Sequence, residues 1–222
     1  MMKFKAIFLD VDGVLVDSEK VFNACWRQAA EDEGYEMTFE QALELRSLDS
    51  SLAKDLFKKW YGHEEAYPAI RQRRKAIMAE RNKEEKLEAK PGVLEFLQQL
   101  KTLPIKVIIV TSSPASRITE YLGSVGIDIS LFDEVISTES VKRGKPYPDV
   151  YHFACKKICF KPEECVAVED SPNGLKSAHD AGCSTIMIPD LSPLTSDLQD
   201  IVYKRYKSLK DINLSVLQNE RN

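Results

Sequence analysis

The sequence has few of the features that place a protein in a membrane or on nucleic acid. Its 222 residues contain no apolar run that approaches the ~20 residues of a membrane-spanning helix. The formal net charge is −4, which provides no excess of positive charge for binding nucleic acid. The first residues enter a predicted strand without the apolar region of a signal peptide. We therefore expect a cytoplasmic protein that binds neither membrane nor nucleic acid.

Cysteine and histidine are also sparse, and their spacing argues against a site for a soft metal. The five cysteines are odd in number and include no Cys-x-x-Cys pair, so we interpret them as reduced thiols. Cys155 and Cys159 are four residues apart on a predicted helix, but no further Cys or His clusters with them in the sequence. Any metal site is therefore expected to use oxygen ligands.

Short apolar runs alternate with helical patterns through most of the chain. The runs typical of buried strands are 6–9, 105–110, 134–136, 166–168 and 185–188. The patterns typical of core helices are 91–100, 114–122, 148–157 and 173–181. This alternation predicts an α/β fold with a Rossmann-like, doubly wound parallel sheet.

The stretch between the first two predicted strands contains no strand pattern. It is predicted to form helices over 20–33, 38–46, 51–60 and 64–86, the second beginning with a capping-box pattern at Thr38. We predict an α/β core domain of residues 1–17 and 89–222 and an all-helical cap domain of residues 18–88, inserted after the first strand and able to close as a lid. The basic run 71–75 in the last cap helix is interpreted as a solvated face.

Polar side chains stand at the ends of the predicted strands and before a core helix. They are Asp10, Asp12, Thr111, Ser112, Lys145, Glu169 and Asp170. Because the carboxyl ends of parallel strands meet at one edge of a sheet, we expect these side chains to converge in one cleft. An unpaired carboxylate is costly to bury, so packing alone does not account for them.

The chemistry of this group indicates phosphoryl transfer. Carboxylates without His or Cys are the ligands that a hard cation such as Mg²⁺ prefers. Hydroxyls, a lysine and backbone amides at a helix start form a cradle for phosphate. A metal and a phosphate cradle together supply the positioning and charge neutralisation on which phosphoryl transfer depends.

Over its whole length the chain resembles the haloacid dehalogenase superfamily, in its branch of helical-cap phosphatases and β-phosphoglucomutase-like enzymes. Four segments carry the resemblance: Asp10 to Ser18, Thr111 with Ser112, Lys145 in Gly-Lys-Pro-x-Pro-Asp, and Glu169-Asp170-Ser171 with Gly174. Each segment alone is a weak signal, but four in this order, each at a strand end, are specific.

The resemblance implies a role for each of these residues. Asp10 would be the nucleophile that forms an aspartyl phosphate, and Asp12 the general acid and base. Thr111, the Ser112 amide and Lys145 would hold the transferred phosphoryl group. Mg²⁺ would be held by Asp10, the backbone carbonyl of Asp12, Asp170 and, through water, Glu169. Helix caps are predicted at Ser113, Asp149 and Ser171, and a hinge-stabilising residue at Asp17.

The favoured function is a Mg²⁺-dependent phosphatase that acts, as a monomer, on a small phosphorylated metabolite such as a sugar phosphate. The alternative is a β-phosphoglucomutase-like phosphomutase. Such mutases usually carry a cap His where this chain has Phe22, and Lys-Gly where it has Arg46-Ser47. A non-catalytic binding protein on the same fold is a third hypothesis. Arg46 itself is expected either to reach the substrate or to lie on a solvated face.

Overall fold

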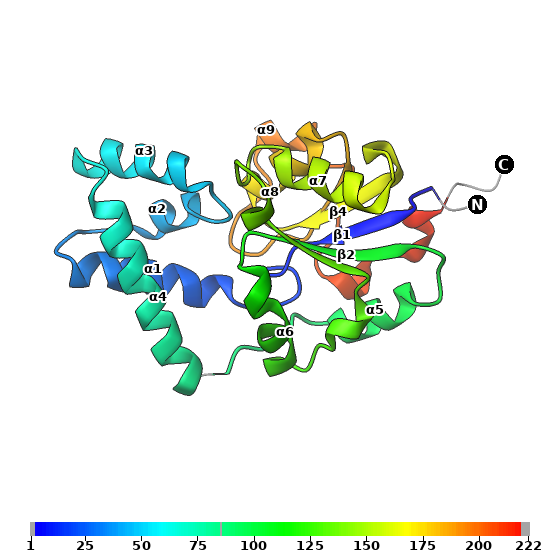
Figure 1. Cartoon of the computed structure of the whole chain (residues 1–222), viewed down its shortest axis with the longest axis horizontal. Helices are drawn as coiled ribbons and strands as arrows, with labels where there is room; N and C mark the ends of the chain where they lie inside the picture. Colours follow the sequence, from blue (N-terminus) through cyan, green and yellow to red (C-terminus); the bar gives the residue numbers. More distant parts are fainter. Residues whose placement is uncertain (1–2, 85, 219–222) are drawn as a thin grey trace.

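The computed structural model describes residues 3–84 and 86–218, and a six-stranded parallel sheet forms its centre (Figure 1). The order of the strands across the sheet is β3-β2-β1-β4-β5-β6. Their bounds are β1 (Ala6–Leu9), β2 (Lys106–Thr111), β3 (Glu134–Ser137), β4 (Cys165–Glu169), β5 (Ser184–Met187) and β6 (Lys204–Arg205). The predicted Rossmann-like sheet is confirmed, and the sixth, two-residue strand at its edge was not predicted.

Helices cover both faces of the sheet. On one face lie α5 (Val93–Leu100) and α6 (Ala115–Ser124); α7 (Asp149–Ile158) and α8 (Pro172–Asp180) lie on the other (Figure 1). Successive side chains of a strand point to opposite faces, so Ile7 and Leu9 join the first hydrophobic cluster while Ala6 and Phe8 join the second. Because both faces of the central strands are buried, β1 and most of β2 and β4 are apolar, which is why the sequence reveals them.

The segment between β1 and α5 folds into helices that lie beside the sheet (Figure 1). These are α1 (Glu19–Asp32), α2 (Phe39–Glu44), α3 (Ser50–Tyr61) and α4 (Ala66–Glu84). We call residues 18–88 the helical insert. It has its own hydrophobic cluster, which includes Trp26, Phe57 and Tyr67. The predicted capping box is confirmed, because Thr38 and Gln41 exchange both of its hydrogen bonds. The predicted last helix ends at Glu84, and residue 85 lies outside the described residues.

Two short segments connect the insert to the sheet and pair with each other. The backbone amide of Asp17 donates to the carbonyl of Glu88 at 2.9 Å, and that of Lys90 donates to Leu15 at 2.9 Å. The Lys90 ammonium also lies 3.4 Å from the Asp17 carboxylate, and the predicted contribution of Asp17 to a hinge stays a prediction. Among the described helices, none is long and apolar enough to cross a membrane.

Candidate active site at the carboxyl edge of the sheet

The three central strands bring the predicted site residues to one edge of the sheet. Asp10 follows β1, Thr111 ends β2, and Glu169 ends β4 with Asp170 directly after it. The strands are in matching register, since Leu9 lies opposite both Ile109 of β2 and Val168 of β4. All four site residues are buried. The predicted convergence therefore occurs for these four residues.

Lys145 pairs with the carboxylates at the ends of β1 and β4. It is fully buried in the loop before α7, and its ammonium donates to Asp10 Oδ1 at 2.9 Å and to Glu169 Oε1 at 2.7 Å. Burial alone would lower the pKa of Lys145, but the two carboxylates outweigh that effect and raise it above its usual range. The lysine therefore stays charged. The Tyr151 hydroxyl donates to the same Glu169 oxygen, a contact that the sequence analysis missed.

Asp10, Glu169 and Asp170 form a compact group of carboxylates whose oxygens lie within 4.8 Å of one another. Burial raises the pKa of Asp10 to about 8, with Lys145 lowering it and Glu169 raising it further. Glu169 Oε2 and Asp170 Oδ1 are buried without a hydrogen-bond partner. Unpartnered, buried carboxylate oxygens are costly, and a hard cation bound to them would remove that cost. The donor set therefore fits Mg²⁺.

Glycines leave the space that these carboxylates occupy. Gly13 has a φ of +80°, and a side chain there would collide with the Asp170 carboxylate. A side chain at Gly174, in the first turn of α8, would collide with the carboxylate of Glu169. The hydroxyl of Ser171 accepts a hydrogen bond from the Gly174 amide at 3.0 Å, so the predicted cap of this helix is confirmed. The first turn of α8 therefore shapes one wall of the site.

Asp12 lies apart from this group, and hydroxyls hold its carboxylate. Oδ1 accepts from Ser18 and from Tyr121, both at 2.8 Å, and Oδ2 accepts from Ser113 at 2.9 Å. The prediction that Ser113 caps a helix is wrong, because its hydroxyl donates to Asp12 instead. The prediction that Asp149 caps a helix is also wrong, since its carboxylate pairs with Arg143 at 2.8 Å. The expected metal contact of Asp12 through its backbone carbonyl stays a prediction.

The predicted phosphate-binding residues at the end of β2 have different environments. Thr111 is fully buried, and its hydroxyl accepts a hydrogen bond from the Ser113 amide at 3.0 Å. Ser112 is exposed at the same edge of the sheet. The phosphate-binding role of both residues stays a prediction.

Arg46 reaches the site from the helical insert. It lies between α2 and α3, is only 6% exposed, and its guanidinium pairs with the Asp170 carboxylate. The same guanidinium lies 2.9 Å from Glu19 Oε2 and donates to the Ser192 hydroxyl at 2.8 Å. The solvated interpretation of Arg46 is therefore wrong. Glu19 was not predicted from the sequence; it is a buried acid, and burial raises its pKa to about 7 despite the lowering effect of Arg46.

Acidic side chains outnumber basic ones at this site. Five carboxylates gather at this edge, and among the described residues two cationic side chains, Lys145 and Arg46, form ion pairs with them. The carboxylates are Asp10, Asp12, Glu19, Glu169 and Asp170. A divalent cation would offset much of the excess negative charge. A phosphate dianion could then approach Asp10 with less repulsion.

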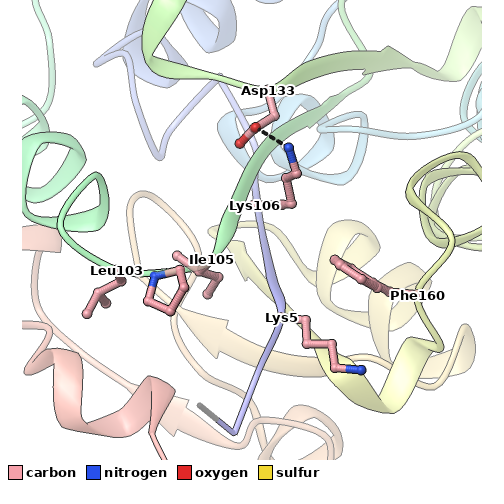
Figure 2. Close-up of a pocket in the computed structure, with 7 residues that line it drawn as sticks. Lys5, Leu103, Ile105, Lys106, Asp133 and Phe160 are labelled. Atoms are coloured by element: carbon pink, nitrogen blue, oxygen red, sulfur yellow. Dashed lines mark hydrogen bonds and ion pairs between the residues drawn. The ribbon is translucent and has the colours of Figure 1, made fainter. Parts of the chain in front are cut away.

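A hollow lies at the opposite, amino edge of the sheet (Figure 2). Its charged groups already have partners: Lys106 lies 2.7 Å from Asp133, and Lys5 lies 2.5 Å from Glu164. The remaining wall consists of apolar side chains such as Leu103, Ile105 and Phe160 (Figure 2). Without unpaired reactive groups this hollow offers no chemistry comparable to the carboxyl edge.

Comparison with known proteins places the chain beside phosphatases. The family model of haloacid dehalogenase-like hydrolases matches residues 7–188. The phosphorylated carbohydrates phosphatase of Thermotoga maritima is 28% identical over 184 residues, which are 82% of this chain and 83% of that protein. Hexitol phosphatase A of Escherichia coli K12 is 31% identical over 189 residues, 84% of each chain.

The fold is also found in a solved structure. A candidate beta-phosphoglucomutase from Bacteroides vulgatus is similar with a TM-score of 0.77 and 27% sequence identity. The similarity covers 97% of this chain and 88% of that one, so it includes both the sheet and the helical insert.

Proposed function

The chain belongs to the haloacid dehalogenase-like hydrolases and is a phosphoric monoester hydrolase, and from that premise we propose that it dephosphorylates a small metabolite through an aspartyl phosphate. The observation that carries the proposal is the buried group of Asp10, Glu169 and Asp170 with Lys145 at its centre. The names of the two phosphatase relatives favour a phosphorylated sugar or polyol as substrate. We also propose that the enzyme is cytoplasmic and monomeric.

Asp10 and Asp170 would hold Mg²⁺, with Glu169 acting through water and the Asp12 backbone carbonyl as a further ligand. The orphaned oxygens of Glu169 and Asp170 support this assignment. When bound, the cation would neutralise the carboxylates and the phosphate oxygens, so that nucleophile and phosphate can approach each other.

The side chains of this enzyme supply the covalent and proton-transfer steps. The Asp10 carboxylate attacks phosphorus and forms a new P–O bond, while the bond from phosphorus to the substrate oxygen breaks. Asp12 gives its proton to that leaving oxygen and then takes a proton from the water that attacks the aspartyl phosphate. Ser18, Ser113 and Tyr121 orient Asp12 for both transfers. The second attack releases inorganic phosphate and restores the Asp10 carboxylate.

The helical insert would act as a cap domain of residues 18–88 on a core domain of residues 1–17 and 89–222. Two observations support this division: the insert has its own hydrophobic cluster, and it joins the core through the paired hinge segments. Arg46 contacts Asp170 from the insert, so closure brings a cap residue into the site. A closed cap would exclude bulk water from the phosphoryl group and supply contacts to the substrate.

A phosphomutase is the second candidate, because a candidate beta-phosphoglucomutase shares the fold at 27% identity. The residue at the expected cap His position is Phe22, which packs in the hydrophobic cluster of the insert and has no group that transfers a proton. This favours transfer to water over transfer to a second hydroxyl. Incubation with β-glucose 1-phosphate separates the two, since a mutase forms glucose 6-phosphate and a phosphatase releases glucose and phosphate.

Turnover of p-nitrophenyl phosphate tests the proposed function. We expect hydrolysis with Mg²⁺, reversible loss of activity with EDTA, and essentially no turnover by Asp10→Asn, since an amide cannot form the acyl phosphate. Circular dichroism should show that this variant keeps its fold. Full activity in metal-free buffer would contradict the metal site, and a near-native rate for Asp10→Asn would contradict the covalent mechanism.

A further inference from the structure

Arg74 of α4 is a half-buried arginine whose guanidinium has no ionic or hydrogen-bond partner among the described residues. Its Nε is fully buried, and the N–H of this atom donates a hydrogen bond to no acceptor. The guanidinium lies over two aromatic rings of α1, 4.8 Å from the centre of Trp26 and 5.4 Å from that of Phe22. The interpretation of the basic run 71–75 as a solvated face is therefore wrong for Arg74.

Two neighbouring arginines of α4 have ordinary surroundings. Arg73 lies 2.5 Å from Asp32, and Arg71 is exposed with its guanidinium 6.0 Å from the ring of Tyr67. Burying a guanidinium without an anion is costly, and ring contacts offset only part of that cost. Arg74 therefore has an unmet requirement for a negatively charged partner that its neighbours on the helix do not have.

Helix α1 relates the position of Arg74 to that of Asp12. The hydroxyl of Ser18, which directly precedes α1, donates to Asp12. Phe22 and Trp26, the rings under Arg74, follow Ser18 by four and eight residues, or roughly 6 and 12 Å along a helix. The charge of Asp12 acts to raise the pKa of Arg74, and the charge of Arg74 acts to lower the pKa of Glu19. Arg74 thus lies one to two helical turns along α1 from Ser18, the residue that contacts Asp12.

The acids nearest to Arg74 are already engaged. Three hydroxyls donate to Asp12, and Glu19 pairs with Arg46. We propose that Arg74 binds a second anionic group of the substrate, a carboxylate or a further phosphate, at the end remote from the ester that Asp10 attacks. The inference rests on the proposed phosphatase function. It narrows the substrate class to metabolites with two separate anionic groups, such as sugar acid phosphates or sugar bisphosphates.

Matched pairs of substrates test this role. The pairs are sorbitol 6-phosphate with 6-phosphogluconate, glycerol 3-phosphate with 3-phosphoglycerate, and fructose 1-phosphate with fructose 1,6-bisphosphate. In at least one pair, wild-type kcat/KM should be roughly 10- to 100-fold higher for the member with two anionic groups. This ratio corresponds to the free energy of one charge-assisted hydrogen bond. Arg74→Met keeps the aliphatic contact with the rings and should bring that ratio close to one, mainly by raising KM.

Two further variants control for structural effects. Arg71→Met removes a charge one turn earlier on the same helix and should leave the ratio unchanged. Arg74→Lys keeps the charge and should retain part of the preference. The inference is overturned if no pair shows a preference in the wild type, if Arg74→Met lowers both members equally, or if Arg74→Lys and Arg74→Met give the same ratio.

Binding measurements separate this inference from the proposed function. Titration calorimetry of the same pairs with Mg²⁺-loaded Asp10→Asn protein gives the affinity ratio without turnover, with Arg74→Met added as a second substitution. A preference that depends on Arg74 supports the site even if the wild type hydrolyses none of the compounds. If the members with one phosphate group are hydrolysed and no pair shows a preference for the second anionic group, the phosphatase function stands and the role of Arg74 is refuted.

Discussion

Replacing Arg46 by glutamine tests how the insert and the carboxylate group depend on each other. The guanidinium pairs with two buried carboxylates, those of Asp170 and Glu19. Removing one partner of a buried ion pair costs about 3–5 kcal/mol, because the other charge stays buried without compensation. In EDTA, we therefore expect Arg46→Gln to lower the free energy of unfolding by about 3–5 kcal/mol.

Magnesium should reverse part of this loss. A cation at Asp170 would restore a positive partner to that carboxylate but not to Glu19. We expect recovery of about 1.5–3 kcal/mol, the value of one charge-assisted contact. By the same cycle, the variant should bind Mg²⁺ roughly 10- to 100-fold more tightly than the wild type, since no guanidinium repels the cation.

Urea unfolding in EDTA and in saturating Mg²⁺ measures the first effect, and calorimetric titration with Mg²⁺ measures the second. Arg143→Gln is the control, because Arg143 forms an exposed pair with Asp149. It should cause the same small change in both buffers. An equal loss for Arg46→Gln in both buffers, or Mg²⁺ affinity no higher than that of the wild type, would refute the reasoning.

Two other substitutions test the roles of the core residues. Asp12→Ala should lower kcat on alkyl phosphates by roughly 10²- to 10⁴-fold, because the leaving oxygen loses its proton donor. On p-nitrophenyl phosphate, whose leaving group needs little protonation, the loss should be smaller, and an equal loss on both would contradict the acid role. Lys145→Met should abolish turnover and lower the free energy of unfolding in EDTA by about 3–5 kcal/mol, since Asp10 and Glu169 lose their buried cation. Urea unfolding beside Lys106→Met, which breaks a partly exposed pair, checks this, and similar losses for the two would count against it.

Much of the sheet and of the carboxylate group could be predicted from sequence, because both depend on local pattern. Strand β1 and the first four residues of β4 are apolar, and Asp10 or Glu169 stands out because it directly follows or ends such a run. Strand β6 lacked this signal. Lys204 and Arg205 are exposed and pair only through their backbone, so no apolar run marks them.

Contacts between distant segments were outside the reach of local pattern. Ser113 and Tyr121 donate to Asp12 across 101 and 109 residues, and nothing in their own neighbourhoods indicates this. For Arg46, the sequence left a cleft position and a solvated position open, and only the packing of the insert against the core decides between them. Arg74 sits among charged neighbours, and the rings that cover it belong to another helix.

The central place of β1 in the sheet has a consequence for synthesis on the ribosome. Ala6 lies opposite Lys106 of β2 and Cys165 of β4, so its two neighbours emerge about 100 and 160 residues later. At about 5–20 residues per second, the second neighbour follows after roughly 8–30 s. The insert contains its own cluster and is complete long before that. The nascent chain must therefore carry β1 without either of its neighbouring strands for that time, and an unpaired apolar strand is exposed to chaperones and to misassociation.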